Sequence, residues 1–114
     1  MSSPALTTLQ TVFGYSEFRP GQQQVVEAVM NGQDCLTIMP TGSGKSLCYQ
    51  IPAISLAGYA IVISPLIALM QDQVAQLESL GVAAAYLNST LDYQQQEEIL
   101  TQVNHHQIKV LYIA

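Results

Sequence analysis

Short apolar runs alternate with helical patterns along this chain, and this alternation limits the folds that the chain can adopt. Because continuous apolar runs with β-branched residues are typical of strands buried on both faces, each run predicts such a strand. Buried strands separated by helices form βαβ units with right-handed crossovers. The sequence therefore predicts an α/β fold with a parallel sheet. The four predicted strands are DCLTIMP (Asp34–Pro40), YAIVISP (Tyr59–Pro65), VAAAYL (Val82–Leu87) and IKVLYIA (Ile108–Ala114).

Helical patterns fill the stretches between these runs. PGQQQVVEAVMNGQD predicts a helix that starts after Pro20 and ends near Gly32. KSLCYQIPAISLAG predicts a helix that ends at Gly58 and is kinked at Pro52. A third helix ends at Gly81, and a polar fourth helix follows the capping residues Asn88-Ser89-Thr90. Their apolar faces are Leu66, Met70, Val74, Leu77 and Leu80 in the third helix, and Ile99 and Val103 in the fourth.

Charge is scarce in this chain, and this limits how it can hold nucleic acid. Charged residues make up 10% of the sequence, and the formal net charge is −5. The only cations are Arg19, Lys45 and Lys109. A basic patch is therefore excluded, and with it a histone-like or arginine-rich binder. Any bound strand is expected to be held by backbone amides, hydroxyls and helix N-termini.

The remaining composition points to an ordinary reducing compartment. Cys35 and Cys48 do not form a Cys-x-x-Cys pair and are expected to be small buried apolar residues. The N-terminal stretch MSSPALTTLQ lacks the basic and apolar regions of a signal peptide, so we expect a cytoplasmic protein. The pair His105-His106 lacks a third ligand at metal spacing, so no metal site is expected there.

The stretch MPTGSGKSLCYQ carries most of a phosphate-binding loop. The pattern requires Gly, four residues and then Gly-Lys-Ser/Thr, but Met39 stands at the position of the first Gly. The stretch lies between a predicted strand and a predicted helix, which is the context that the motif needs. The missing Gly matters little if Met39 ends the strand and the tight turn begins at Thr41. The alternative is a Gly-rich turn with a surface lysine.

Each position of the phosphate-loop motif has a chemical role in such a site. Gly42 and Gly44 allow backbone amides to point inward around an anion, and the helix N-terminus adds partial positive charge. Lys45 supplies a point charge for the β- and γ-phosphates, and the Ser46 hydroxyl suits a Mg²⁺ ligand. The sequence therefore predicts a nucleotide site.

A second candidate lies upstream, in FGYSEFRPGQ. The amide of Gln22 can pair with the N6/N7 edge of adenine, Tyr15 can stack on a purine, and Arg19 can contact the base or a phosphate. The alternative is a capped turn with Phe13 and Phe18 in the core. From the residues alone, this alternative is favoured.

The third candidate, ISPLIALMQDQ, contains a strong helix start. Ser64 is expected to be the N-cap and Pro65 the first helical residue. In a parallel sheet, all strand-to-helix loops lie at the carboxyl edge, so three loops should open onto one face. One would hold nucleotide phosphate, and the other two would be either ordinary caps or contacts for a polyphosphate backbone. These loops are Thr41–Ser46, Ser64–Leu66 and Asn88–Leu91.

The motifs FGYSEFRPGQ, MPTGSGKSLCYQIPA, ISPLIALMQDQV, AAYLNST and VLYIA occur in the order and wording of the RecQ-family DNA helicases. Over nearly its whole length the chain resembles the first part of the first RecA-like motor domain. The resemblance implies a P-loop NTPase (RecA-like) parallel sheet with flanking helices. It implies that residues 1–114 are the N-terminal part of the ATP-binding domain, truncated before the Asp-Glu-Ala-His motif and incomplete at the C-terminus.

The resemblance also implies roles for individual residues. Tyr15 would stack on adenine, Arg19 would assist, and Gln22 would contact the base edge. The loop Thr41-Gly42-Ser43-Gly44-Lys45-Ser46 would bind ATP, with Lys45 as the catalytic residue on the phosphates and Ser46 on Mg²⁺. Single-stranded DNA would pass along Ser64, Pro65, Leu66, Asn88, Ser89 and Thr90. Two departures are Ser43, where the family usually has Gly, and Gln71, where Lys is common.

The function that this resemblance implies is that of an ATP-dependent 3′-to-5′ DNA helicase, which unwinds duplex DNA in repair and recombination. We expect these 114 residues alone to be catalytically incompetent, because the second RecA-like domain with its arginine finger is needed. A small-molecule kinase is disfavoured, since the single Arg precedes the loop. A non-catalytic nucleotide-binding or interaction fragment is the other alternative.

Overall fold

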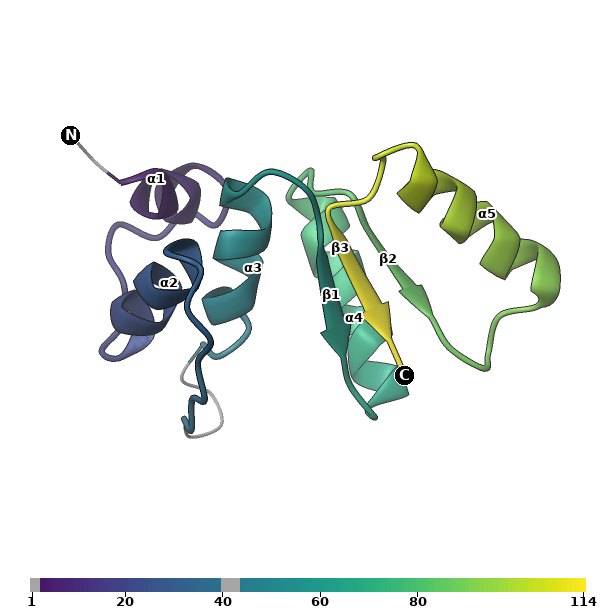
Figure 1. Cartoon of the computed structure of the whole chain (residues 1–114), viewed down its shortest axis with the longest axis horizontal. Helices are drawn as coiled ribbons and strands as arrows, with labels where there is room; N and C mark the ends of the chain where they lie inside the picture. The colour runs from purple at the N-terminus through teal and green to yellow at the C-terminus, as the bar shows by residue number, and fades with distance from the viewer. Residues whose placement is uncertain (1–2, 40–43) are drawn as a thin grey trace. The chain divides into compact units, whose positions relative to one another are not determined.

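The computed structural model describes residues 3–39 and 44–114, and the chain divides into two compact units. The first unit, Met1–Ala57, is helical in its described part, and the second, Gly58–Ala114, is an α/β unit (Figure 1). Each unit has its own buried core, and each is described separately below.

Three helices make up the helical unit: α1 (Pro4–Thr11), α2 (Gln22–Met30) and α3 (Leu47–Ser55). Ser3 caps α1, because its hydroxyl accepts from Leu6 N at 3.1 Å. The hydroxyls of Thr8 in α1 and Ser55 in α3 are hydrogen-bonded at 2.8 Å. The core is formed by Ala5, Leu9, Val26 and Ile51, with Leu6, Phe13, Phe18, Met30 and Leu47 packed against it.

Two of these helices were predicted, with different accuracy at their ends. The structure confirms the helix after Pro20, and Gly32 closes α2 in the left-handed conformation (φ +78°). The helix expected to end at Gly58 instead ends at Ser55. Pro52 lies inside α3, where it removes one backbone donor.

The strand predicted for Asp34–Pro40 is wrong in its described part, residues 34–39. These residues form no regular structure, and Leu36 and Ile38 are 93% and 91% exposed. A strand is stabilised by pairing with a neighbour, and the described part of this unit contains no other strand. Cys35, expected to be buried, is exposed for the same reason.

Three parallel strands form the sheet of the second unit: β1 (Ala60–Ile63), β2 (Ala84–Leu87) and β3 (Val110–Ile113), in the order β1-β3-β2. The helices α4 (Ile67–Ser79) and α5 (Tyr93–Asn104) connect them. The structure therefore confirms the parallel sheet, three of the four predicted strands and both connecting helices. Figure 1 shows α4 behind the strands and α5 beside β2.

Apolar side chains of the two helices bury the sheet unevenly. Met70, Val74 and Leu77 of α4 are buried, as their spacing predicts. Ile99 and Val103 of α5 pack against a cluster on and beside the sheet, formed by Ala85, Ile108 and Leu111. Both helices pack mainly against β2.

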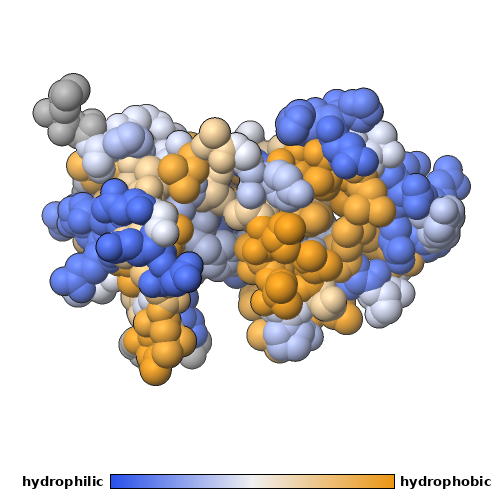
Figure 2. Space-filling view, viewed as in Figure 1, coloured by the Kyte–Doolittle hydropathy of each residue, from blue (hydrophilic) through white to orange (hydrophobic). Residues whose placement is uncertain are grey.

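The prediction that all strands are buried on both faces is wrong for β1. Ile61 and Ile63 are 53% and 81% exposed, because they lie on one face of the edge strand β1 while the two helices pack mainly against β2. Figure 2 shows hydrophobic surface over this part of the unit. An exposed apolar edge strand is a surface on which another strand can pair.

The C-terminal ends of α4 and α5 share one hydrogen-bonding pattern but differ in the residue that supports it. In α4, Val82 N donates to Leu77 O at 2.9 Å, and Gly81 takes the left-handed conformation at φ +83°. In α5, Gln107 N donates to Gln102 O at 2.9 Å, and His106 takes that conformation at φ +58°. A side chain at this position costs free energy that glycine avoids.

We predict that His106→Gly raises the free energy of unfolding by about 1 kcal/mol, because it relieves a left-handed non-glycine residue. Gly81→Ala should lower this free energy by a similar amount. Chemical denaturation followed by circular dichroism measures both. The control is His105→Gly, at a residue with negative φ, which should not be stabilising. A destabilised His106→Gly variant would contradict this account of the α5 terminus.

Candidate nucleotide-binding site

Gly44, Lys45 and Ser46 lead directly into α3, as the phosphate-loop pattern predicts. The other three residues of the predicted loop, Thr41, Gly42 and Ser43, lie outside the described residues. Leu47 N donates to Gly44 O at 3.3 Å, and Cys48 N donates to Lys45 O at 3.0 Å. These i to i+3 bonds tighten the entry to the helix and place Lys45 next to its positive end.

Ser46 is the N-cap of α3, but its side chain makes no capping hydrogen bond. Its carbonyl accepts from Gln50 N at 3.0 Å, so the backbone of Ser46 supports the helix while its hydroxyl does not. Lys45 is exposed. The arrangement fits a hydroxyl ligand for Mg²⁺ beside a cation for phosphate.

Gln22 is the buried polar centre of the helical unit. It is 1% exposed, and its side-chain amide bonds at both ends. Oε1 accepts from Arg19 N at 2.8 Å, and Nε2 donates to Gly44 O at 3.0 Å. The first residue of α2 is thereby tied to the residue that precedes Lys45.

Gly44 has two reasons to be glycine. Its φ of +80° lies in the left-handed region, and a Cβ there would collide with Nε2 of Gln22. The Cδ of Arg19 lies 3.9 Å from the same Cβ position. The structure therefore brings Gly44 to Arg19 and Gln22, from which it is far apart in the sequence.

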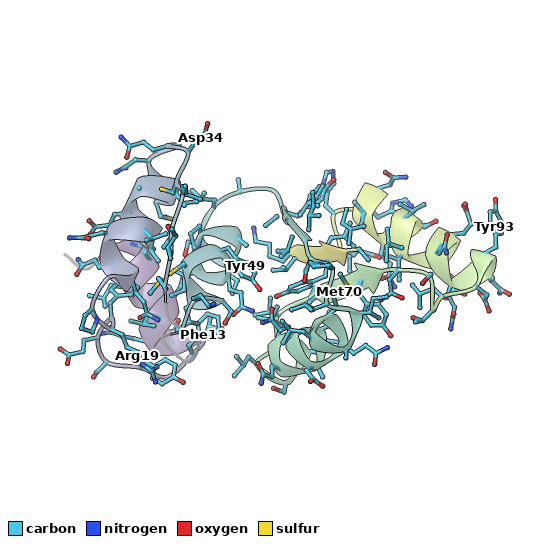
Figure 3. The ribbon with its side chains drawn as sticks, turned by 90° about the horizontal axis from the view of Figure 1, so that it is seen from below. Phe13, Arg19, Asp34, Tyr49, Met70 and Tyr93 are labelled. Atoms are coloured by element: carbon cyan, nitrogen blue, oxygen red, sulfur yellow. The ribbon has the colours of Figure 1, made fainter. Side chains whose placement is uncertain are left out.

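The other predicted adenine contact, Tyr15, lies in the segment between α1 and α2. Its side chain is 51% exposed, and its backbone N–H donates to Leu9 O at 3.2 Å. Figure 3 labels Phe13 and Arg19 in the same segment. The structure gives Tyr15 an accessible ring.

The geometry constrains how Gln22 can read a base. Among the described residues, Oε1 accepts from Arg19 N and Nε2 donates to Gly44 O, and an amide group has one further N–H and one further lone pair beyond these two bonds. Because the side chain is buried, an adenine edge reaches it only after a local opening. Any partner that binds this amide would therefore affect the contact with Gly44.

We predict that Gly44→Ala destabilises the helical unit more than Gly32→Ala does. Both glycines have positive φ, but a Cβ at Gly32 meets open space, whereas one at Gly44 displaces Gln22. Gly32→Ala should cost about 1 kcal/mol, and Gly44→Ala should cost about 1 kcal/mol more for the broken amide contact. Denaturant titrations compare the two, and equal losses would contradict a structural role for the contact.

Ser64, Pro65 and Leu66, predicted to lie along DNA, follow β1. The prediction that Ser64 caps the helix and Pro65 begins it is wrong, because the N-cap of α4 is Leu66. The Ser64 hydroxyl instead accepts from Leu66 N at 3.1 Å in a local turn, a bond that competes with capping. Ser64 N donates to Ile113 O at 2.9 Å, which extends the pairing of β1 with β3.

Asn88, Ser89 and Thr90 follow β2, and the predicted cap is again displaced. Asn88 is buried and its Oδ1 accepts from Thr90 N at 2.9 Å, while its Nδ2 approaches Sδ of Met70 at 3.9 Å. The N-cap of α5 is Asp92, whose carboxylate accepts from Gln95 N in a capping box. Asp92 occupies the N-cap position because its capping box satisfies two backbone donors. Ser89 and Thr90 are exposed.

The loops after β1 and β2 lie at the same edge of the sheet. Ile63 and Leu87 both pair with Ile113 in a parallel register. This confirms the predicted common edge for Ser64–Leu66 and Asn88–Leu91. The predicted third loop, Thr41–Ser46, belongs to the other unit.

Lys109, the third cationic residue of the sequence, lies in the α/β unit. Nζ of Lys109 donates to Gly58 O at 2.8 Å, at the amino end of β3.

Across residues 3–39 and 44–114, no group of three or more His, Cys, Asp or Glu side chains is placed to hold a metal ion. Within that same part of the chain, no helix has the length and apolar character needed to cross a membrane.

Residues 19–114 match the DEAD/DEAH box helicase family. The chain belongs to this family. It is 51% identical over 110 residues to the ATP-dependent DNA helicase RecQ of Haemophilus influenzae and 47% identical over 114 residues to that of Pasteurella multocida. These matches cover 96% and 100% of this chain but 18% of each relative. A RecQ of Bacillus subtilis is 48% identical over 111 residues, which are 96% of this chain and 19% of that relative.

These findings confirm the resemblance to RecQ helicases and the RecA-like P-loop fold class of this helicase-family chain. Sequence reasoning missed the contact between Gln22 and Gly44. Gln22 lies at the start of a helix and Gly44 directly precedes Lys45, so both positions stand out in the sequence. Nothing in the sequence, however, gives the distance between the two residues. It also missed the contact between Met39 and Cys48 described below.

Proposed function

We propose that residues 1–114 are the N-terminal part of the ATP-binding RecA-like domain of a cytoplasmic, ATP-dependent DNA helicase. The proposed enzyme unwinds duplex DNA with 3′-to-5′ polarity in repair and recombination. The observation that carries the proposal is the tie between Gln22 and Gly44, which joins the predicted base reader to the residue before Lys45. The relatives are named ATP-dependent DNA helicases, and these names support ATP and DNA as the substrates.

In the proposed site, three elements act on the nucleotide phosphates. The ammonium of Lys45 binds the β- and γ-phosphate oxygens, and the N-terminus of α3 adds its partial charge. Ser46 would help to hold Mg²⁺, which would supply positive charge beside the phosphates. Thr41, Gly42 and Ser43 are proposed to complete the loop.

Adenine recognition is proposed for Gln22, with Arg19 and Tyr15 beside it. The N–H₂ group and the carbonyl oxygen of the Gln22 amide match the N7 and N6 groups of adenine, whereas guanine presents an acceptor in place of the N6 donor. Because the same amide holds Gly44, base binding at Gln22 would be felt at the phosphate end of the site.

DNA contacts are proposed at the carboxyl edge of the sheet, from Ser64, Pro65, Leu66, Asn88, Ser89 and Thr90. The formal net charge of −5 leaves little electrostatic attraction for a phosphate backbone. Contacts at this edge would therefore come from hydroxyls and backbone amides, with the exposed Ser89 and Thr90 best placed for them.

Binding of a fluorescent ATP analogue with Mg²⁺ tests the nucleotide site. Lys45→Ala should weaken binding by at least about tenfold, because a cation paired with phosphate is lost. Lys109→Ala is the matched control, since it removes another of the three cations and should leave affinity unchanged. Equal affinities of wild type and Lys45→Ala, in a chain that is folded by circular dichroism, would contradict the proposal.

The same assay tests the base reader. Gln22→Ala should reduce the preference for adenine over guanine nucleotides, because the amide that distinguishes them is absent. Gln23→Ala is the control, since the Gln23 side chain is exposed and bonds to Glu27 within α2 at 3.0 Å. An unchanged preference in Gln22→Ala would exclude Gln22 as the reader.

We also predict that this chain alone neither hydrolyses ATP at a substantial rate nor unwinds duplex DNA. The proposed helicase needs a second RecA-like domain, and the chain spans 18% of the two relatives above. Steady-state phosphate release, with and without single-stranded DNA, measures hydrolysis. Turnover that single-stranded DNA stimulates and Lys45→Ala abolishes would overturn this prediction.

A further inference from the structure

Met39 and Cys48 stand on either side of the predicted phosphate loop in the sequence, and their side chains meet. Sγ of Cys48 lies 3.9 Å from Sδ of Met39, in the geometry of a weak S–H···S hydrogen bond. Cys48 is the second residue of α3, so it belongs to the turn that follows Lys45 and Ser46. The contact therefore ties the end of the extended segment to the start of α3.

The same methionine reaches a second helix. Its terminal methyl Cε lies 3.9 Å from the position that a Cβ would take on Gly21. Gly21 is the N-cap of α2 and directly precedes Gln22, whose amide bonds to Gly44. Met39 thus contacts the beginning of α3 and lies beside the beginning of α2, and each of these helix starts carries residues of the proposed nucleotide site.

The chemistry of the two sulfurs suits a packing contact. The thiol of Cys48 is a weak hydrogen-bond donor, and the thioether of Met39 is a weak acceptor. A thioether on an unbranched side chain fills irregular gaps between helices. The glycine that the phosphate-loop pattern expects in place of Met39 has no side chain to make either contact.

We infer that Met39 is a positioning residue, which holds the first turn of α3, with Lys45 and Ser46, against the start of α2. The inference rests on the proposed nucleotide-binding function. Without this contact, the first turn of α3 is less well ordered before nucleotide binds, and the cost of ordering it further is subtracted from the affinity.

Two substitutions at Met39 separate packing from sulfur chemistry. Met39→Ala removes the contacts and should weaken binding of the ATP analogue with Mg²⁺ by about tenfold. Met39→Leu keeps similar volume and should bind within about twofold of wild type. Recovery by the leucine variant distinguishes a positioning contact from a requirement for sulfur.

Met30→Ala is the matched control. Met30 ends α2 and packs against the core of the same unit, so its loss lowers the melting temperature without touching the start of either helix. It should leave affinity at the wild-type level in the folded chain. If Met30→Ala weakens binding as much as Met39→Ala does, the effect is general destabilisation and the inference is overturned.

Amide hydrogen exchange of the nucleotide-free chain tests the contact without ligand. The N–H groups of Cys48 and Tyr49 donate to Lys45 O and Ser46 O in the first turn of α3. Met39→Ala should speed their exchange by about tenfold, while Met30→Ala should not. Unchanged exchange in Met39→Ala overturns the inference even where Lys45→Ala abolishes binding and the proposed function stands. If wild type binds no nucleotide, the proposed function fails and the positioning role fails with it.

Discussion

The helical unit depends on one buried amide. Gln22 has 1% of its surface exposed, and its two polar ends are satisfied by Arg19 N and Gly44 O. An unpaired buried amide costs free energy, so this pairing fixes the start of α2 against the residue before Lys45. It also explains why Gly44 cannot carry a side chain. The order of the proposed phosphate site follows from this constraint, because the entry to α3 cannot shift without breaking it.

The sequence was sufficient for those parts of the fold that local patterns determine. The helical spacing of Met70, Val74 and Leu77 predicted the buried face of α4, and the apolar runs predicted β1, β2 and β3. It was insufficient where stability depends on a neighbour distant in sequence. Residues 34–39 have the composition of a buried strand but pair with no described strand, and Ile63 is exposed because the helices pack mainly against β2. Apolar composition indicates a tendency to pair and says nothing of where a partner lies.

The candidate site, like the fold, was predicted from the sequence where it depends on local features. Gly-Lys-Ser at the start of a helix was predictable from spacing, because backbone amides and a helix terminus are local features. Helix caps were misplaced, since Ser64 and Asn88 use their side chains in local turns while Leu66 and Asp92 occupy the N-cap positions. The roles of Tyr15, Arg19 and Gln22 came from the family resemblance, and the structure adds the contact of Gln22 with Gly44. Contacts between segments more than twenty residues apart were beyond any spacing argument.

The central claim is that one amide links base recognition to the phosphate end of the site. The most direct measurement is a nuclear magnetic resonance titration of the chain with Mg·ATP, following the side-chain N–H₂ signal of Gln22 together with the backbone amides of Gly44–Cys48. We expect these signals to shift together at the same concentration of Mg·ATP. Mg·GTP should shift the backbone amides as Mg·ATP does, but it should not shift the Gln22 signal as Mg·ATP does. A Gln22 signal that stays unchanged while the Gly44–Cys48 amides shift would contradict the link.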